Sequence, residues 1–300
     1  MKIGVVILNY NDYANTRQCV LHLRSLKLIN YIVVVDNCSS DDSYEKLSHL
    51  KHEIDGWFLL RTEANKGYGY GNNRGIAFLR ENTDTDIVCI SNPDVEFDDD
   101  FVKCIIEDFD NNHDIGLISG IQMTPEGEIS PNAFWQRKIF KGEIEFMLRS
   151  LTIVRRFVHS QKRKEFIIKA LEAKKNIIDV PVLSGCLFFA SIDVMYKIGY
   201  FDENTFLYYE EDILSEKMHR SGFKVCIDPR VRFLHIGGGS TKNVMDNAKM
   251  FEISCNSYLY FADHYMLKSV VERIVFHFVY AIFWIDRKTV YKMRKIMGMD

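Results

Sequence analysis

The sequence predicts an α/β fold with a central, mostly parallel sheet flanked by helices. Short β-branched runs alternate with helix-like segments over the first hundred residues, and each run is nearly continuous in apolar residues. Such strands are typical of a parallel sheet that is covered on both faces. Three of the runs end in polar residues, at Asn9-Tyr10-Asn11, Asp36-Asn37 and Asn92-Pro93-Asp94. Because ligands bind at the carboxyl ends of parallel strands, these residues predict a site on one edge of the sheet.

The individual elements follow from local patterns along the chain. Apolar runs predict strands at 3–8, 31–36, 57–61 and 86–91, and helices are predicted at 13–27, after the N-cap residues 39–42, and at about 71–81. The second half predicts a strand at 180–191, a helix at about 210–221, a short strand near 224–227 and helices over 244–300.

Composition narrows the class of protein. The chain has 300 residues, 47% of them hydrophobic, and a net charge of −3, so nothing in the overall charge predicts a nucleic-acid partner. Seven scattered cysteines without a C-x-x-C pair indicate reduced thiols in a cytosolic protein. The first apolar run predicts a strand rather than a signal peptide. The longest apolar stretch, residues 274–285, is too short for a bilayer-spanning helix.

Two segments differ from the predicted α/β pattern. Residues 137–175 contain twelve Lys or Arg against four Glu, with apolar residues interleaved, which predicts a basic amphipathic helix. We interpret this segment as an insertion in a domain of residues 1–243. Residues 244–300 are predicted to form a helical C-terminal extension with a basic end.

A Gly-rich loop, EANKGYGYGNNRG (63–75), precedes a predicted helix. Its backbone N–H groups are therefore candidates for contact with a phosphate. The glycine spacing is not that of the dinucleotide fingerprint G-x-G-x-x-G, and the loop follows the third strand rather than the first. A flexible loop is the alternative interpretation.

Three acids, Glu210-Glu211-Asp212, precede the predicted helix at 210–221. Acids are ordinary in the first turn of a helix, and that is the simpler interpretation. Desolvation by Tyr208 and Tyr209 would raise the pKa of a carboxylate toward values that suit a general base.

His235 ends a short apolar stretch and precedes the glycines 237–239. These glycines would allow a small ligand to approach, and imidazole is a common ligand for transition metals such as Mn²⁺. A structural histidine is the alternative.

Taken together and in order, these motifs resemble those of inverting nucleotide-sugar glycosyltransferases of family two, which have the GT-A fold. The resemblance covers about 230 residues, and its specificity lies in the ordered set rather than in any one motif. The Asn-Pro-Asp form looks most like bacterial rhamnosyltransferase-like members. The matching segments are 5–10, 34–41, 65–75, 92–94, 183–186, 199–203, 209–212 and 235–240.

The resemblance implies a bound nucleotide sugar, with Asp36 accepting from the N3–H of a pyrimidine base. Thymidine- and uridine-linked donors both present this edge. The implied donor-binding residues are Leu8, Asn9, Tyr10, Asp36, Asn65, Lys66, Gly67, Tyr68, Gly71, Asn72, Asn92 and Gly185.

The resemblance also implies a metal and a catalytic base. Asp94 would bind a divalent cation, Mn²⁺ or Mg²⁺, with His235 as a second contact, and Asp212 would be the general base beside Glu211. The sequence departs from the family at Asn92, which stands where relatives have an Asp, so one anionic metal ligand is absent. It also departs at Leu214, where many relatives carry a further acid.

The expected function is transfer of a sugar from dTDP-rhamnose or a UDP-hexose to a hydroxyl of a glycan or lipid-linked acceptor, in cell-surface polysaccharide synthesis. An inactive nucleotide-sugar-binding module is one alternative, and the presence of both Asp94 and Asp212 argues against it. A nucleotidyltransferase is another, but residues 5–17 contain one Arg and no glycine for a triphosphate loop.

The basic, aromatic-rich segments predict contact with an anionic membrane surface. A solvated helical face and a homodimer interface are the alternatives. The expected location is the cytoplasm, or the inner face of the cell membrane as a peripheral protein.

Overall fold

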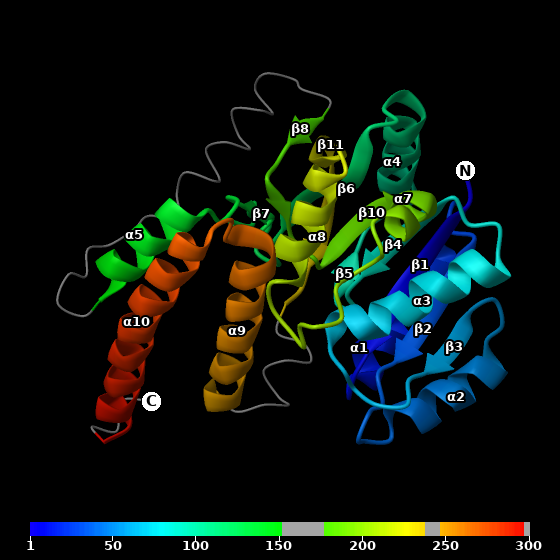
Figure 1. The fold of residues 1–300 in the computed structure, drawn as a ribbon. Helices are drawn as coiled ribbons and strands as arrows, with labels where there is room; N and C mark the ends of the chain where they lie inside the picture. The colour runs from blue at the N-terminus through cyan, green and yellow to red at the C-terminus, as the bar shows by residue number, and fades with distance from the viewer. Residues whose placement is uncertain (152–176, 238–246, 297–300) are drawn as a thin grey trace.

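The computed structural model describes residues 1–151, 177–237 and 247–296 (Figure 1). Within them a nine-stranded sheet has the order β3-β2-β1-β4-β10-β6-β11-β5, with β8 paired to β11. Its strands are β1 Ile3–Asn9, β2 Tyr31–Asp36, β3 Phe58–Arg61, β4 Ile87–Ser91, β5 Val95–Glu96, β6 Ile115–Met123, β8 Ile178–Asp179, β10 Leu187–Ser191 and β11 Lys224–His235. A separate two-stranded sheet pairs β7 (Phe134–Trp135) with β9 (Val182–Leu183).

The first four strands of the sheet, β3-β2-β1-β4, are all parallel. Asn9 pairs with Asp36, and Ile7 pairs with Ser91, so the carboxyl ends of β1, β2 and β4 lie side by side. On the other side of β4 the pairing becomes mixed, because β10 runs antiparallel to both β4 and β6. The predicted fold, with a mostly parallel sheet and flanking helices, is confirmed.

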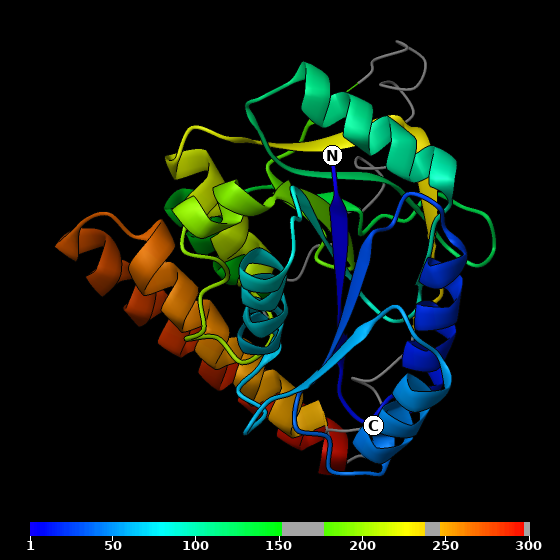
Figure 2. The same cartoon turned by 90° about the vertical axis from the view of Figure 1, so that its right-hand side faces the viewer.

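Helices cover both faces of the sheet (Figure 2). Successive residues of β1 point to opposite faces, so Val5 belongs to one core cluster and Val6 to the other. The first face is covered by α1 (Tyr13–Ser25), α2 (Ser43–Glu53) and α4 (Asp99–Asn111), and the second by α3 (Tyr68–Asn82), α7 (Ile192–Lys197) and α8 (Glu210–Arg220).

A third core cluster joins the C-terminal helices to the rest of the molecule. It contains residues from α5 (Phe140–Ser150), α9 (Asn247–Phe261), the π-helical turn η1 (Ala262–Met266) and α10 (Val270–Ile296). Ile213 of α8 is fully buried in the same cluster. The predicted helical extension is therefore confirmed, and it packs behind the helix that begins with the three acids. No helix of the described residues has both the length and the hydropathy of a bilayer span.

Several element boundaries differ from the prediction. The strand predicted at 180–191 is split into β9 and β10, because the chain turns at residues 184–186. The strand predicted near 224–227 continues to His235. The N-cap residue of α2 is Asp42, whose side chain makes no capping bond. The Oδ1 of the preceding residue, Asp41, accepts from the Ser43 N–H at 3.0 Å instead.

Two predictions fall wholly or partly outside the described residues. Of the basic segment 137–175, the described part contains α5, and residues 152–176 lie outside. The boundary between residues 243 and 244 also lies outside them.

Strand β6 and helix α4 had no counterpart among the predicted elements.

Candidate active site

A cavity of about 380 Å³ opens at the carboxyl ends of β1, β2 and β4. This volume lies in the range of small-molecule sites. Its walls are Leu8, Tyr10, Asp12, Asn37, Asn65, Gly67, Tyr68, residues 92–94, 184–186, 206–208, Glu210, Glu211, His235 and Met250. The predicted spatial convergence of segments from residue 8 to residue 235 is therefore present in the structure.

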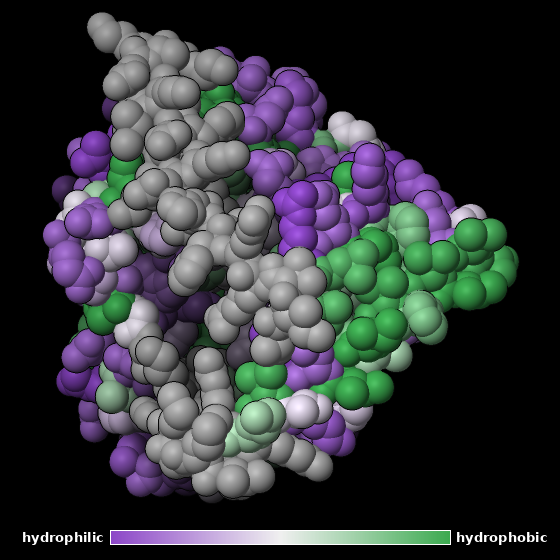
Figure 3. Space-filling model, turned by 90° about the vertical axis from the view of Figure 1, so that its left-hand side faces the viewer, coloured by the Kyte–Doolittle hydropathy of each residue, from purple (hydrophilic) through white to green (hydrophobic). Residues whose placement is uncertain are grey.

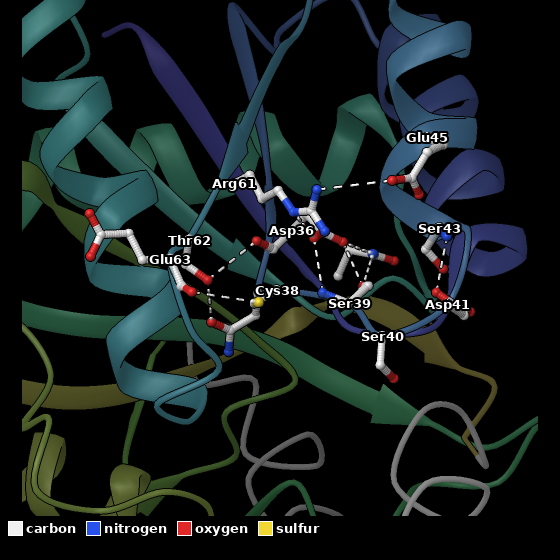
Figure 4. A network of polar contacts seen from close by, with 12 residues as sticks. Asp36, Cys38, Ser39, Ser40, Asp41, Ser43, Glu45, Arg61, Thr62 and Glu63 are labelled. Atoms are coloured by element: carbon white, nitrogen blue, oxygen red, sulfur yellow. Dashed lines mark hydrogen bonds and ion pairs between the residues drawn. The ribbon is translucent and has the colours of Figure 1, made fainter.

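Asp36 does not line the cavity. Its side chain lies in a network of polar contacts at the end of β2 (Figure 4). The residue is fully buried. Its Oδ1 accepts from Asn9 Nδ2 at 2.8 Å and from Ser39 Oγ at 2.6 Å, and its Oδ2 accepts from the Ser39 N–H at 3.0 Å. Both oxygens are thus engaged with the ends of β1 and β2. This geometry differs from the expected contact with a base and gives Asp36 the position of a structural anchor.

Asn37, the next residue, faces the cavity instead. Its Nδ2 donates to Asn65 Oδ1 and to the Gly67 carbonyl, each at 3.0 Å, and its Oδ1 accepts from Thr62 Oγ1 at 3.1 Å. These bonds fasten the Gly-rich loop to the end of β2.

The same loop requires glycine at position 67. Gly67 has a φ of +108°, and a Cβ there would lie 2.2 Å from the Phe206 carbonyl oxygen. The next residue, Tyr68, donates its N–H to that oxygen at 2.8 Å and its hydroxyl to the Gly185 carbonyl at 2.9 Å. Three segments distant in sequence are therefore held together around one wall of the cavity.

Asp94 and His235 face each other across the β5–β11 pair. Strand pairing sets His235 opposite Val95, and His235 Nε2 lies 3.4 Å from Asp94 Oδ1. Burial lowers the pKa of His235, but the contacts with Asp94 and Cys186 together outweigh burial and raise that pKa to about 10. Burial raises the pKa of Asp94, but the bond from His235 outweighs it and lowers the pKa below its usual value. Gln122 Nε2 lies 2.9 Å from His235 Nδ1.

The three acids begin α8 directly after two strained tyrosines. Tyr208 and Tyr209 have φ values of +71° and +68°, which is the left-handed region that non-glycine residues rarely adopt. Tyr209 stacks on Tyr258 and Phe261 of α9, with ring centroids 5.2 and 5.8 Å apart. The C-terminal helices thus hold the strained turn that aims the acids.

Glu211 and Asp212 point to different surroundings. Glu211 lines the cavity and is partly exposed, and burial raises its pKa to about 7. Asp212 is only 5% exposed and does not line the cavity. Its carboxylate accepts from Trp135 Nε1 at 3.2 Å and from Lys138 Nζ at 2.5 Å. Burial raises the pKa of Asp212 as well, although Lys138 opposes the shift.

Most of the residues predicted from the sequence meet at this site. Those that line the cavity are Leu8, Tyr10, Asn65, Gly67, Tyr68, Asn92, Asp94, Gly185, Glu211 and His235. Those that do not line it are Asn9, Asp36, Lys66, Gly71, Asn72 and Asp212. Asn37, Glu210 and Met250 also line it, although none of them was among the expected donor-binding, catalytic or metal residues.

The donor set near Asp94 suits a divalent cation held jointly with a ligand. A carboxylate and an imidazole face the same cavity, and both are acceptable to Mn²⁺. The described residues contain no cluster of three or more His, Cys, Asp or Glu arranged around a metal position. Two protein ligands fit a cation whose other positions are filled by phosphate oxygens and water.

Comparison with known proteins agrees with the fold and the motifs. Residues 4–191 match the model of Glycosyl transferase family 2. The chain is 24% identical over 275 residues to the low-salt glycan biosynthesis hexosyltransferase Agl10 of Haloferax volcanii, covering 90% of this chain and 76% of that protein. It is also 24% identical over 217 residues to the N-acetylglucosaminyl-diphospho-decaprenol L-rhamnosyltransferase of Mycobacterium tuberculosis, covering 70% and 67%.

Among solved structures, the fold is similar to that of GalNAc-T7, crystallised with UDP, GalNAc and Mn²⁺. The TM-score is 0.60 at 15% identity, over 87% of this chain and 48% of that one, so the chain spans about half the length of GalNAc-T7. The sheet order and the cavity at the strand ends define an α/β enzyme with the GT-A fold. The chain belongs to glycosyl transferase family 2 and is a glycosyltransferase.

Proposed function

We propose that the chain transfers a sugar, with inversion, from dTDP-rhamnose or a UDP-hexose to a hydroxyl of a glycan or lipid-linked acceptor in cell-surface polysaccharide synthesis. One observation carries the proposal: the same cavity is lined by the ends of β1 and β2, by Asp94 and by Glu211. A nucleotide, a diphosphate and a reacting sugar therefore have adjacent places. The names of the two relatives, a hexosyltransferase and a rhamnosyltransferase, support the hexose class.

The base contact first expected of Asp36 passes to Asn37 in this proposal. Asp36 is fully buried and does not line the cavity, whereas Asn37 does. The Asn37 Oδ1 accepts one bond from Thr62 and keeps a second lone pair, which can accept from a pyrimidine N3–H. The side chains of Leu8 and Tyr10, which line the same cavity, would then border the nucleoside.

Asp94 and His235 would hold the divalent cation, which would offset negative charge on the departing nucleoside diphosphate. Because His235 is paired with Asp94 at 3.4 Å, the imidazole must give up its proton before it can serve as a ligand. Asn92 lines the cavity two residues earlier and offers a neutral amide oxygen there.

The general base in this proposal is Glu211 rather than Asp212. Its carboxylate faces the cavity with a pKa of about 7, which suits proton abstraction near neutral pH. Glu211 takes the proton of the acceptor hydroxyl while that oxygen bonds to the anomeric carbon. The bond from that carbon to the diphosphate oxygen breaks on the opposite face. Asp212 holds Lys138 and Trp135 in place beside this carboxylate.

The test is a screen of donors with the purified chain. Thermal unfolding is followed with UDP, dTDP, UDP-hexoses and dTDP-rhamnose, with and without Mn²⁺, and donor hydrolysis is measured in parallel. We expect a uridine or thymidine diphosphate to raise the midpoint and its sugar conjugate to be cleaved slowly in the absence of an acceptor. If no pyrimidine nucleotide raises the midpoint, the donor-site assignment is wrong.

We place the reaction on the cytoplasmic side of the cell membrane. The acceptor named for the mycobacterial relative is linked to decaprenol, a polyprenol lipid, and this supports a lipid-linked acceptor here.

A further inference from the structure

Helix α10 is apolar on two opposite faces. Its inner face is packed, with Phe276 fully buried and Tyr280 8% exposed in the third core cluster. Its outer face carries five apolar side chains at intervals of three or four residues, each between 41% and 70% exposed: Val271, Ile274, Phe278, Ile282 and Ile285. We call these five residues the outer apolar face.

The outer apolar face is part of a larger hydrophobic patch (Figure 3). Helix α5 lies beside α10, and its Phe146 is 54% exposed and contacts Phe283 of α10, with ring centroids 6.5 Å apart. A helix that is apolar all round is normally buried, and an exposed patch of this kind marks a contact surface. The high exposure of the five side chains means that none of the described residues supplies that cover.

The charge of α10 and its flanking residues indicates what kind of surface the outer apolar face contacts. Residues 268–296 contain seven Lys or Arg against two acids, in a chain whose net charge is −3. Five of the seven lie at residues 287–295, so parallel docking on the same helix of a second copy would bring two basic ends together. An anionic lipid surface instead attracts each basic residue near it.

Aromatic and basic residues are also paired as they are in interfacial helices. Lys288 Nζ lies 4.4 Å from the centroid of the Trp284 ring, which is 36% exposed. Such pairs place an apolar ring at the level of the lipid headgroups and a cation above it. We propose that the outer apolar face of α10 docks on the surface of an anionic lipid bilayer, with the helix lying in the plane of the interface.

The helix that carries this surface packs against a helix that lines the cavity. Met250 at the start of α9 lines the cavity, and Tyr258 of α9 packs edge-to-face on Phe276 of α10 at 5.5 Å. Docking of α10 would therefore fix the position of the cavity relative to the membrane. Delivery of a lipid-linked acceptor to Glu211 is a consequence that rests on the proposed function, whereas docking itself does not.

The experiment is co-sedimentation of the full chain with vesicles of phosphatidylcholine alone or mixed with phosphatidylglycerol, at low and high salt. The test variant carries Ile274→Glu, Phe278→Glu and Ile285→Glu. The control variant carries Ala14→Glu, Gln18→Glu and Leu21→Glu, which place three charges of the same kind on exposed positions of α1. Circular dichroism and thermal unfolding establish that both variants are folded, and sedimentation velocity gives the oligomeric state.

We expect the wild type and the α1 variant to pellet with the anionic vesicles and to stay in solution with the neutral ones. The fraction of the α10 variant that pellets with anionic vesicles should be lower than that of the wild type by at least about tenfold. Failure of the wild type to pellet at low salt, or equal pelleting of the α10 variant, overturns the proposal. A wild-type dimer that the α10 variant dissociates also overturns it, because the face is then covered by a second copy.

Discussion

A Cβ atom at Gly185 would lie 2.9 Å from both Cγ and Oε1 of Glu211. Gly185 belongs to the turn between β9 and β10, and Glu211 lies in the first turn of α8, so the two residues meet at one wall of the cavity. The Glu211 carboxylate can occupy this position because residue 185 has no side chain.

The first prediction concerns Gly185→Ala. The added methyl group displaces the end of a flexible side chain rather than backbone, so the fold should tolerate it. We expect kcat for sugar transfer to fall about 10²-fold, because misplacement of a catalytic group by about 1 Å has effects of this size. The midpoint of thermal unfolding should change little.

Gly142→Ala is the matched control for this prediction. A Cβ at Gly142 meets only Ile139 Cγ1, at an ordinary 3.5 Å. This variant should transfer sugar at the wild-type rate. A Gly185→Ala enzyme that is equally active would show that the position of Glu211 is unimportant.

The second prediction separates Glu211 from Asp212. Glu211→Gln keeps the shape of the side chain but cannot accept a proton, so kcat should fall by about 10²–10⁴-fold with donor affinity retained. Asp212→Asn disturbs Lys138 and Trp135 without removing the base, and its loss of kcat should be smaller. The measurements are kcat for transfer and the Kd of the nucleotide sugar. A larger loss of kcat in Asp212→Asn would return the role of base to Asp212.

The third prediction is a pH dependence. Burial raises the pKa of Glu211 to about 7 from an ordinary value of 4.5. Only the ionised form can accept the acceptor proton, so kcat/KM should rise about tenfold per pH unit on the acid side and level off above about pH 8.

The same pKa shift affects stability with a defined sign. Unfolded Glu211 ionises near its ordinary value, whereas the folded residue keeps its proton up to about pH 7. The contribution of Glu211 to stability therefore falls as pH rises between these two values, and Glu211→Gln lacks that contribution. The difference in the free energy of unfolding between the wild type and Glu211→Gln, measured with urea, should be constant below pH 4.5. At pH 8 that difference should have shifted in favour of Glu211→Gln. A pH-independent difference between the two proteins would contradict the assigned pKa.

The fold was largely accessible from sequence because its strands are buried on both faces. Buried parallel strands give continuous apolar runs, and β1, β2 and β4 agree with their predicted ranges to within a residue. The split of residues 180–191 was not accessible, because both halves are apolar and the turn at Gly185 is set by tertiary contacts with Glu211 and Tyr68. Strand β11 was underestimated because its second half, after Pro229, shows no continuous apolar run.

The sequence predicted which segments form the candidate site, but not which of two neighbouring residues faces the cavity. Asp36 and Asn37 are adjacent at a strand end, and alternation sends one side chain into the sheet rim and the other into the cavity. Glu211 and Asp212 are likewise adjacent on a helix, about 100° apart, and Glu211 faces the cavity whereas Asp212 faces Trp135 and Lys138. Sequence patterns locate such pairs, and the packing of α8 against α9 decides between their members.

The fourth prediction tests whether Asp36 is an anchor. Asp36→Asn replaces a buried acceptor of three hydrogen bonds with an amide that must turn an N–H toward other donors. The free energy of unfolding should fall by about 1–3 kcal/mol. The Kd of a pyrimidine nucleoside diphosphate should change by less than about threefold for the folded protein, since Asp36 does not line the cavity. Weakened nucleotide binding at unchanged stability would assign Asp36 a direct contact with the base.

The fifth prediction concerns the divalent cation. Asp94 is the acidic residue that faces His235, and Asn92 supplies no charge beside it, so removal of Asp94 leaves that wall of the cavity without an anionic metal ligand. Chelation with EDTA should stop transfer by the wild type, and added Mn²⁺ should restore it. Asp94→Asn should need a much higher Mn²⁺ concentration for half-maximal activity, by about tenfold or more, because a carboxylate is exchanged for a neutral amide.

Isothermal titration of Mn²⁺ in the presence of the nucleoside diphosphate provides a readout independent of activity. Glu96→Gln, two residues further on and exposed, is the control for the loss of one negative charge and should bind Mn²⁺ as the wild type does. Equal Mn²⁺ affinity in Asp94→Asn and Glu96→Gln would exclude Asp94 as a ligand.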